Sequence, residues 1–460
     1  MRGKTGLGSA AALLAAVGIL VAGCGGSDSN SSSGGTPASG TKGGTINVAI
    51  VDNPQMKDIA KLTPSLFTAK SGIKVKYTVL DEGTLRQVTT RDVAAGGRQF
   101  DVAMIGMYEA PQFGQNGSLV DLTPQASADA AYKLDDVIPS VKNGLSADGK
   151  LYAAPFYAES SFLMYRKDVL KKAGVTMPPK PTWQQVADIA KKVNSPNMAG
   201  ICLRGKPGWG DLGAAFTTVL NTFGGTWWSA KPDGSIDKAM VDQPEFKQAL
   251  DFYVNLVKAA GERDAANASF NECLSQYKDG KVAMWYDATV AAGLLEASDS
   301  PVKGKNGYAL APTVKTPASG WLWSWALAIP KTTQKQDLAW KYISFATGPD
   351  YIKEAGPKVS GGWASIPPGT RKSTYELPEY KKAAAAFADE TLAAMAAAPI
   401  DNPGTTKRPG LPGVQYVGVP EFQDVGNQCT EQFSSVIAGR ADIDSALKKC
   451  QDVASQAASG

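Results

Sequence analysis

The order of strand and helix patterns at the start of the chain constrains its fold more than any other feature of the sequence. Residues 46–51 and 100–105 read as apolar strands, and residues 73–79 alternate between apolar and polar side chains. Helical patterns separate these strands; the first runs to Ala69, and the second opens at Asp81 with residues typical of a helix N-terminus. Alternating strands and helices predict a parallel sheet with helices on its faces.

A polar loop follows each of these three strands. The loops are residues 52–55 (DNPQ), 81–84 (DEGT) and 106–109 (GMYE). Ligands of such sheets bind at the carboxyl ends of the strands, so a binding site is expected here. With 460 residues, 43% of them apolar, the chain is long enough for two or three domains or one large two-lobed domain.

The composition excludes several kinds of function. The chain has no histidine, which removes Ser-His and Cys-His nucleophile pairs and histidine-ligated metals, and no metal or cofactor is expected. The formal net charge of +4 is too small an excess to indicate a nucleic acid or an acidic membrane surface as partner. No phosphate-binding loop of the G-x-x-x-x-G-K-S/T type occurs, so the chain is not expected to bind ATP. Paired carboxylates remain possible as catalysts.

Residues 1–23 have the pattern of a secretory signal peptide. Arg2 and Lys4 precede an apolar run, roughly residues 10–22, which is too short to span a bilayer comfortably. Small residues then lead into a cysteine, Cys24. An ordinary signal peptide with an incidental cysteine is the alternative interpretation.

The sequence LVAGC at residues 20–24 resembles the lipobox of bacterial lipoproteins. The resemblance implies cleavage before Cys24 and acylation of its sulfur. Residues 24–44 are rich in glycine and serine and predict a flexible tether between a lipid anchor and a folded domain. The expected location is therefore the extracellular face of the cell membrane, with the anchor at Cys24.

Four further cysteines predict two disulfides, because an exported chain with an even number of cysteines usually pairs them. Three connectivities are possible. Residues 421–438 and 441–456 predict two helices with Gly439 at the turn, and this hairpin would place Cys429 beside Cys450. By elimination, the second predicted disulfide is Cys202–Cys273. Four free buried thiols are the alternative.

A row of tryptophans alternates in the segment GWLWSWALAIP, residues 320–330. On a strand, Trp321, Trp323 and Trp325 would share one face. Large aromatic side chains are mostly core packing, but they also stack on ligands. The row therefore predicts either a packed core or one wall of a binding site.

Several blocks of the sequence resemble bacterial extracellular solute-binding proteins, which serve ABC importers. Residues 150–170 are similar to a G-K-L-Y-A segment ending in Y-R-K-D-L, residues 182–188 to a T-W helix start, and residues 280–287 to an A-M-W strand. The segment ending WALAIP occupies the place of a further strand. Together these blocks span nearly all of residues 45–456.

Finer features resemble the branch that binds linear polyols such as sorbitol and mannitol. The most specific are GICLRGKPGWG at residues 200–210 and MWYDATVAA at 284–292. The others are DEGTLRQ (81–87), GRQFDVAMIG (97–106), APFYAESS (154–161), SFNE (269–272) and PGTRKSTYE (368–376). The four cysteines are not a general feature of that branch.

The resemblance implies an α/β fold of the type II periplasmic-binding-protein class. Two lobes, each a parallel-type sheet flanked by helices, would be joined by a hinge that the chain crosses three times. The crossings would fall near residues 156–162, 285–288 and 331–336. The expected ranges are 45–156 with 289–331 for the N-terminal lobe and 162–285 with 336–456 for the C-terminal lobe. A ligand would lie between the lobes, which close over it.

A polyol needs charged acceptors, charged or amide donors and aromatic plates, because it offers many hydroxyls and weakly apolar C–H faces. The family-matched segments supply all three. The expected ligand-binding residues are the acceptors Glu82, Glu109, Glu159 and Asp287, the donors Asn53, Arg86, Arg204 and Asn271, and the plates Tyr108, Trp209, Trp285, Trp323 and Trp325.

Structural roles are open for several of these residues. Arg204 could form an ordinary surface salt bridge, and Asp287 could cap a following helix. Glu82 and Arg86 are four residues apart on an expected helix and could pair with each other. For the tryptophan row we expect a split role: one or both of Trp323 and Trp325 floor the cleft, while the first tryptophan packs at its rim or below.

The expected function is the substrate-binding component of an ABC importer for a linear sugar alcohol, with no chemistry done on the ligand. The partners would be the polyol or sugar and the permease subunits of the importer, and the protein would be a monomer. Alternatives are a binding protein for a mono- or disaccharide, a secreted glycoside hydrolase using carboxylates such as Glu82 and Asp287, and a structural or adhesive lipoprotein.

Overall fold

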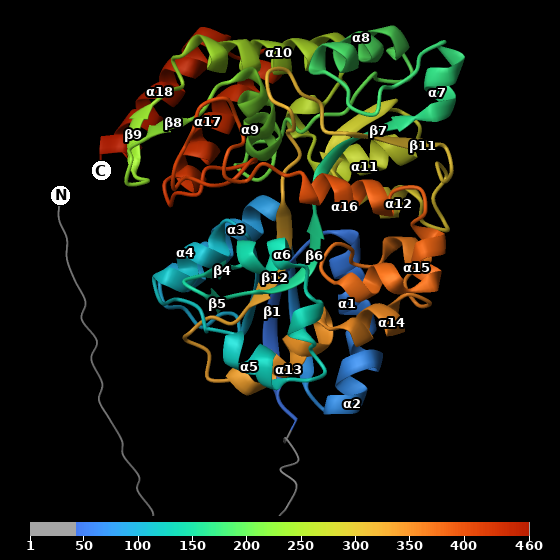
Figure 1. The fold of residues 1–460 in the computed structure, drawn as a ribbon, viewed down its shortest axis with the longest axis vertical. Coiled ribbons are helices and arrows are strands. Elements are labelled where there is room, and N and C mark those ends of the chain that lie inside the picture. Colours follow the sequence, from blue (N-terminus) through green and yellow to red (C-terminus); the bar gives the residue numbers. More distant parts are fainter. Residues whose placement is uncertain (1–42, 460) are drawn as a thin grey trace, which may run out of the picture. The chain divides into compact units, whose positions relative to one another are not determined.

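The three strands expected at the start of the chain form a parallel sheet in the structure, a computed structural model that describes residues 43–459 (Figure 1). β1 (Thr45–Val51) lies between β2 (Lys74–Leu80) and β3 (Val102–Gly106) and is parallel to both. Two later strands, β12 (Trp323–Ala328) and β6 (Ala154–Glu159), extend the sheet in the order β2-β1-β3-β12-β6. β12 is antiparallel to both neighbours, so the sheet is mixed.

The signal peptide, the lipidated Cys24 and nearly all of the tether expected from the sequence lie outside the described residues.

Helices surround the five-stranded sheet, and we call this group of elements the first lobe (Figure 1). α3 packs against β1 and β3, and α13 packs against β6. A π-helical segment, Pro64–Thr68, joins α1 to α2, and this continuous helix ends at Gly72, whose φ of 70° is left-handed. The helices are α1 (Pro54–Thr63), α2 (Ala69–Ser71), α3 (Glu82–Ala94), α4 (Glu109–Gln115), α5 (Thr123–Ala128), α6 (Pro139–Gly144), α13 (Gln336–Thr347), α14 (Pro349–Ala355) and α15 (Pro378–Ala383), with a short hairpin of β4 (Ser146–Ala147) and β5 (Lys150–Leu151).

A second sheet of three strands centres the other group of elements, the second lobe. β7 (Ser161–Arg166) lies between β10 (Met284–Ala288) and β11 (Asn306–Leu310), antiparallel to both. Its helices are α7 (Lys167–Lys172), α8 (Trp183–Val193), α9 (Leu212–Phe223), α10 (Pro244–Ala260), α11 (Phe270–Lys278), α12 (Ala291–Leu295), α16 (Ala388–Ala396), α17 (Phe422–Ile437) and α18 (Ile443–Ser459), with a hairpin of β8 (Trp228–Ala230) and β9 (Ile236–Ala239).

The start of α8 shows how local sequence fixes these helices. The Thr182 hydroxyl accepts from the Gln185 backbone N–H, and the Gln185 side chain accepts from the Thr182 N–H, forming a capping box. The apolar residues that follow recur at helical spacing and are buried, among them Trp183, Val186 and Ala190. None of the helices in the described range is long and apolar enough to cross a membrane.

Strand pairing revises the lobe ranges expected from the sequence. The expected ranges put residues 289–331 in one piece with the first lobe, but β11 pairs with β7 of the second. They put residues 336–456 with the second lobe, but α13 packs on β6 of the first. The expected crossings near residues 285–288 and 331–336 are therefore misplaced, because each stretch stays beside the sheet that it has already joined.

We propose three connections between the lobes at other places. The first is Ser160, between β6 and β7, within the crossing that the sequence predicts. The second is the segment from β11 to β12, and the third lies between α14 and α16, since α16 packs against β11. The alanine-rich run from Lys381 to Ala398, expected as one helix, is broken between α15 and α16, where Phe387 is buried.

Two cysteine pairs lie at bonding distance, and they are the pairs that the sequence predicts. Cys202 joins Cys273 on α11, with Cα atoms 5.7 Å apart. Cys429 on α17 joins Cys450 on α18, with Cα atoms 5.0 Å apart. Gly439 lies in the turn between these two helices with a φ of 71°. The second pair therefore ties together the two arms of the C-terminal helical hairpin.

Candidate ligand-binding site

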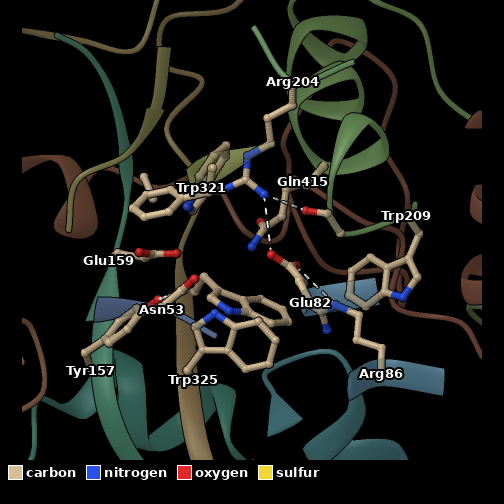
Figure 2. A pocket seen from close by; sticks show the side chains of 15 residues that line it. Asn53, Glu82, Arg86, Tyr157, Glu159, Arg204, Trp209, Trp321, Trp325 and Gln415 are labelled. Carbon is tan, nitrogen blue, oxygen red and sulfur yellow. Dashed lines mark hydrogen bonds and ion pairs between the residues drawn. The ribbon is translucent and has the colours of Figure 1, made fainter. Parts of the chain in front are cut away.

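A pocket of about 430 Å³ lies between side chains of the two lobes (Figure 2). This volume includes space that is open to solvent, so the pocket is described by its lining residues. Asn53 follows β1, and Glu82 begins α3 just after β2, so the expected edge of the sheet forms part of the pocket wall. The lining residues are Asn53, Glu82, Arg86, Tyr157, Glu159, Arg204, Trp209, Gly210, Ala214, Phe270, Ala288, Trp321, Trp323, Trp325 and Gln415.

The tryptophan row forms one wall of this pocket. Trp321, Trp323 and Trp325 all line it, and the rings of Trp323 and Trp325 meet edge to face with centroids 5.7 Å apart. Gly106, the register partner of Trp325 on β3, leaves the space that the Trp323 indole fills, because a Cβ there would collide with the ring. On the opposite face of the strand, the Ser324 hydroxyl donates to the carbonyl of Tyr157 at 2.8 Å.

Arg86 is held by one carboxylate in the pocket wall, Glu82, by one behind it, Glu109, and by aromatic rings around it. Its Nη2 lies 2.8 Å from Glu82 Oε1, and its Nη1 lies 2.5 Å from Glu109 Oε1. The guanidinium carbon lies 4.0–4.9 Å from the ring centroids of Trp209, Trp323 and Trp325. Burial alone would lower the pKa of Arg86, but the carboxylates of Glu109 and Glu82 outweigh it and raise that pKa.

Arg204 is the second buried cation of the site, and the second lobe holds it. Its Nε and Nη2 donate to the two carboxylate oxygens of Asp287 at 2.8 and 2.7 Å, and its Nη1 donates to the Gly210 carbonyl at 2.9 Å. Nη1 also lies 3.5 Å from Glu82 Oε2. Figure 2 shows the Glu82 carboxylate between the two arginines, so this one acid links a cation of each lobe.

Asp287 orients Arg204 and does not reach the pocket. Its side chain is fully buried, and Oδ2 also accepts from Trp285 Nε1 at 3.1 Å. The next helix, α12, begins at Ala291 and has Val290 at its N-cap, so Asp287 does not cap it. Burial raises the pKa of Asp211, which faces the same arginine, to about 7; Glu82 adds to this rise and Arg204 opposes it.

Glu159 lines the pocket at the side away from Arg86 and Trp209 (Figure 2). It is 5% exposed, and its Oε2 has no hydrogen-bond partner among the described residues. Burial raises the pKa of its carboxyl well above the usual range, because Arg204 compensates only part of the cost. Beside it, Asn53 Nδ2 donates to the Tyr157 hydroxyl at 3.0 Å.

Four pocket side chains carry a buried polar atom that has no partner among residues 43–459. They are the Oε2 of Glu159, the indole N–H groups of Trp209 and Trp321, and the Oε1 of Gln415. The Trp209 nitrogen lies on the side of its ring away from Glu82 (Figure 2), so a ligand in the pocket would meet the other three. Buried polar groups are nearly always hydrogen-bonded in folded proteins. Unmatched donors and acceptors around one pocket indicate a ligand that carries both, and hydroxyl groups do.

The structure brings together eight of the thirteen residues predicted to bind the ligand. Those lining the pocket are Asn53, Glu82, Arg86, Glu159, Arg204, Trp209, Trp323 and Trp325. The other five lie outside its wall: Tyr108, Glu109, Asn271, Trp285 and Asp287.

The five residues outside the wall mostly support it. Glu109 and Asp287 each hold an arginine, and Trp285 bonds to Asp287. Tyr108 packs on Trp209 with ring centroids 4.7 Å apart. Asn271 links the lobes, since its Nδ2 donates to the carbonyl of Asp52 at 2.8 Å.

Seven lining residues were absent from the predicted site. Tyr157 and Trp321 carried a usable signal, because each lies two residues from a predicted neighbour, Glu159 or Trp323, on a strand-like segment. Gln415 lies in an irregular stretch after a Pro- and Gly-rich loop, where no periodic pattern exists. The remaining four are Gly210, Ala214, Phe270 and Ala288.

Comparison with known proteins agrees with this fold. The family model of the bacterial extracellular solute-binding proteins matches residues 47–353. A mannitol-binding protein of Pseudomonas aeruginosa is 41% identical over 416 residues, which cover 88% of this chain and 91% of that protein.

Solved structures give the same result. An ABC transporter solute-binding protein from Agrobacterium vitis S4 with bound D-mannitol aligns with a TM-score of 0.85 and 44% identity, covering 90% of this chain and 98% of that one. An ABC transporter solute-binding protein from Agrobacterium radiobacter K84 in complex with ribitol aligns with a TM-score of 0.76 and 26% identity. The alignment covers 90% of this chain and 99% of that one. The chain therefore belongs to the family of bacterial extracellular solute-binding proteins.

Proposed function

We propose that this chain is the substrate-binding component of an ABC importer and that it captures a linear sugar alcohol between its two lobes. The observation that carries the proposal is the pocket itself, where two fixed arginines, two glutamates and four tryptophans surround a small buried space. Such a mixture matches the hydroxyls and C–H faces of a polyol. The mannitol-binding relative and the mannitol- and ribitol-bound structures support the same ligand class.

The geometry also argues against the hydrolytic alternative. A glycoside hydrolase would need Glu82 and Asp287 as a pair of carboxyl groups flanking the scissile bond. Asp287 is fully buried outside the pocket wall, and both of its oxygens are bound by Arg204. It is therefore not available as an acid, base or nucleophile.

The remaining parts of the proposed function concern location and partners. Solute-binding proteins of this family work outside the cytoplasm, and we propose that acylated Cys24 and the tether of residues 24–44 hold this one at the extracellular face of the membrane. Its partners would be the permease subunits of the importer, and we propose that it acts as a monomer. Mass determination of the membrane-extracted protein would test the lipid, since an acylated Cys24 predicts a diacylglycerol adduct.

Calorimetry with a ligand panel tests the central claim. The panel is mannitol, sorbitol, arabitol, xylitol, glucose, maltose and trehalose. We expect tight binding of the alcohols and weak or absent binding of the cyclic sugars. Tight binding of a cyclic sugar alone would keep the importer role and overturn the polyol assignment.

A further inference from the structure

Glu159 differs from every other acid of the site in having no cation of its own. Glu82 and Glu109 are paired with Arg86, and Asp287 is paired with Arg204. Within residues 43–459, no ion pair reaches the Glu159 carboxyl. The residue is only 5% exposed, and one of its carboxyl oxygens has no hydrogen-bond partner. A buried carboxyl without a counter-charge is costly, and a ligand can provide that charge.

Aromatic side chains surround this carboxyl. Glu159 is the register partner of Trp323 on the neighbouring strand, and Tyr157 is the partner of Trp325. Trp321 completes the wall on the same side of the pocket (Figure 2). A carboxylate among aromatic faces is the environment that recognises an ammonium group, through a charge-assisted hydrogen bond and cation–π attraction. The faces of Trp323 and Trp325 are shared with Arg86, whereas Trp321 has no such cation over it in the described part of the chain.

The charge of the site as a whole favours the same kind of ligand. Two guanidinium groups, Arg86 and Arg204, face three paired carboxyl groups in and directly behind the pocket, Glu82, Glu109 and Asp287. Two further carboxyl groups, Glu159 and Asp211, have a pKa raised by burial and add negative charge when they lose their protons. A ligand carboxylate would add to this acidic excess, while a ligand ammonium would offset it.

We propose that the pocket also takes amino-alditols, linear sugar alcohols in which a protonated amine replaces one terminal hydroxyl, with the ammonium bound to Glu159. The proposal rests on the proposed polyol-binding function and extends its ligand class. The same geometry discriminates against aldonates, in which a carboxylate stands at that terminus.

Proton release accompanies this binding. The ionisable groups that face Glu159 are Tyr157 on its own strand, Glu82 on α3, Arg204, and Asp287 on β10. Burial, with smaller contributions from Asp287 and Glu82, keeps the carboxyl protonated to higher pH, and Arg204 opposes this. The carboxyl loses its proton when it accepts the ammonium. The affinity for amino-alditols therefore rises with pH until the amine itself deprotonates. The affinity for uncharged alditols does not show this rise.

A matched set of three probes tests the proposal by calorimetry on the purified protein. Sorbitol, D-glucamine and D-gluconate share their stereochemistry and carry a hydroxyl, an ammonium or a carboxylate at the same carbon. We expect D-glucamine to bind at least as tightly as sorbitol and D-gluconate to bind at least about a hundredfold more weakly. In the Glu159→Gln variant, the affinity for D-glucamine should fall at least about tenfold relative to the affinity for sorbitol. This is the effect expected from losing one charge-assisted hydrogen bond.

Glu262→Gln is the control, because it alters a buried glutamate outside the pocket and should leave the ratio of the two affinities unchanged. Binding of mannitol or sorbitol without D-glucamine would overturn the amino-alditol proposal and leave the proposed function standing. No binding of any alditol would overturn both. Should Glu159→Gln fail to fold, the wild-type protein decides: equal pH dependence for sorbitol and D-glucamine between pH 6 and pH 8 overturns the proposal.

Discussion

At the scale of single residues, the polar side chains of the site fall into two groups. Some have hydrogen-bond or ion-pair partners within the protein, and others have atoms without a partner among the described residues. Arg86 and Arg204 have their positions fixed by carboxylates before any ligand arrives. Their N–H groups are therefore pre-organised, which lowers the entropy cost of binding. The polar atoms left without partners on Glu159, Trp321 and Gln415 are those that a ligand can complete.

Trp323→Ala should weaken polyol binding by roughly tenfold to a hundredfold, because it removes an aromatic plate from the pocket wall and one of the faces that hold Arg86. Calorimetry with mannitol measures the change. Leu327→Ala is the control, since Leu327 is buried on the same strand but lies outside the pocket. Both variants should melt at lower temperature, and only the first should lose affinity. Unchanged affinity in Trp323→Ala would remove this side chain from the site.

Glu262 should make the protein less stable as the pH rises. Burial raises the pKa of its carboxyl from an ordinary 4.5 to about 8, and Asp264 adds to the rise. A folded-state pKa above the unfolded value means that the folded protein holds the proton more tightly. The stabilising contribution is thus complete below about pH 4.5 and is lost as the pH rises through 8.

Glu262→Gln, which cannot ionise, should remove this part of the pH dependence, on the order of 3 kcal/mol between pH 5 and pH 8. Urea unfolding at pH 5, 6, 7 and 8 measures it. Glu379→Gln, at an exposed position, is the control and should leave the pH profile as in the wild type. Parallel profiles for wild type and Glu262→Gln would contradict the expectation.

At the scale of elements, what could be predicted from the sequence follows the strength of local periodicity. The first three strands, their parallel pairing and the tryptophan wall were all predictable, because period-two and helical patterns are local. The antiparallel insertion of β12 between β3 and β6 was not, since strand order depends on contacts distant in sequence. The same limit explains the misplaced lobe crossings, where β11 joined β7 across more than a hundred residues.

The site was predictable to a similar degree. Charged residues in family-matched loops, such as Glu82 and Arg204, were found from residue type and position. Whether a side chain faces the pocket or holds another from behind is a matter of a few ångströms. Glu109 and Asp287 carry carboxylates that could bind a polyol hydroxyl. Only the structure shows that each forms an ion pair with an arginine instead. The family resemblance itself is confirmed by the match over residues 47–353.

The two disulfides should differ in what their removal does to ligand binding. Replacing Cys429 and Cys450 by alanine should cost about 3 kcal/mol, from the 21-residue separation, and leave affinity unchanged, because α17 and α18 do not line the pocket. Replacing Cys202 and Cys273 should cost about 4 kcal/mol, from the separation of 71 residues, and should also weaken binding. Cys202 lies two residues before Arg204 and fixes its segment to α11.

Urea unfolding gives the stability of each double variant, and calorimetry with mannitol gives its affinity. Equal losses of affinity in both variants would show that the disulfides act on the whole fold, and not on the segment that carries Arg204.

At the scale of the whole folded unit, the structure has the two lobes in contact across the pocket. Asn271 on α11 bonds to the backbone after β1, and Arg204 of the second lobe approaches Glu82 of the first. Gly210 of the second lobe fits against the same cluster, because a Cβ there would meet Glu82 Oε1 and lie 2.7 Å from Arg86 Nε. We propose that these contacts belong to a closed arrangement of the two lobes about a hinge.

Gly210→Ala should hinder closure, since its methyl group would stand between the lobes. We expect polyol affinity to fall at least about tenfold, with little change in melting temperature of the ligand-free protein. Calorimetry gives the affinity, and small-angle scattering with and without mannitol gives the compaction. Gly83→Ala, whose Cβ would lie 3.6 Å from Asp81 Oδ1 and meet nothing closer, is the control. Wild-type affinity and compaction in Gly210→Ala would contradict the proposed closure.

The tryptophan wall has a practical consequence. Four of the chain's 10 tryptophans, Trp209, Trp321, Trp323 and Trp325, line the pocket. Indole emission responds to water, to nearby cations and to new hydrogen bonds at the ring nitrogen, and a ligand entering this space alters all three. The protein thus contains its own fluorophores where occupancy changes their surroundings, and it can report ligand concentration as an optical sensor without any attached dye.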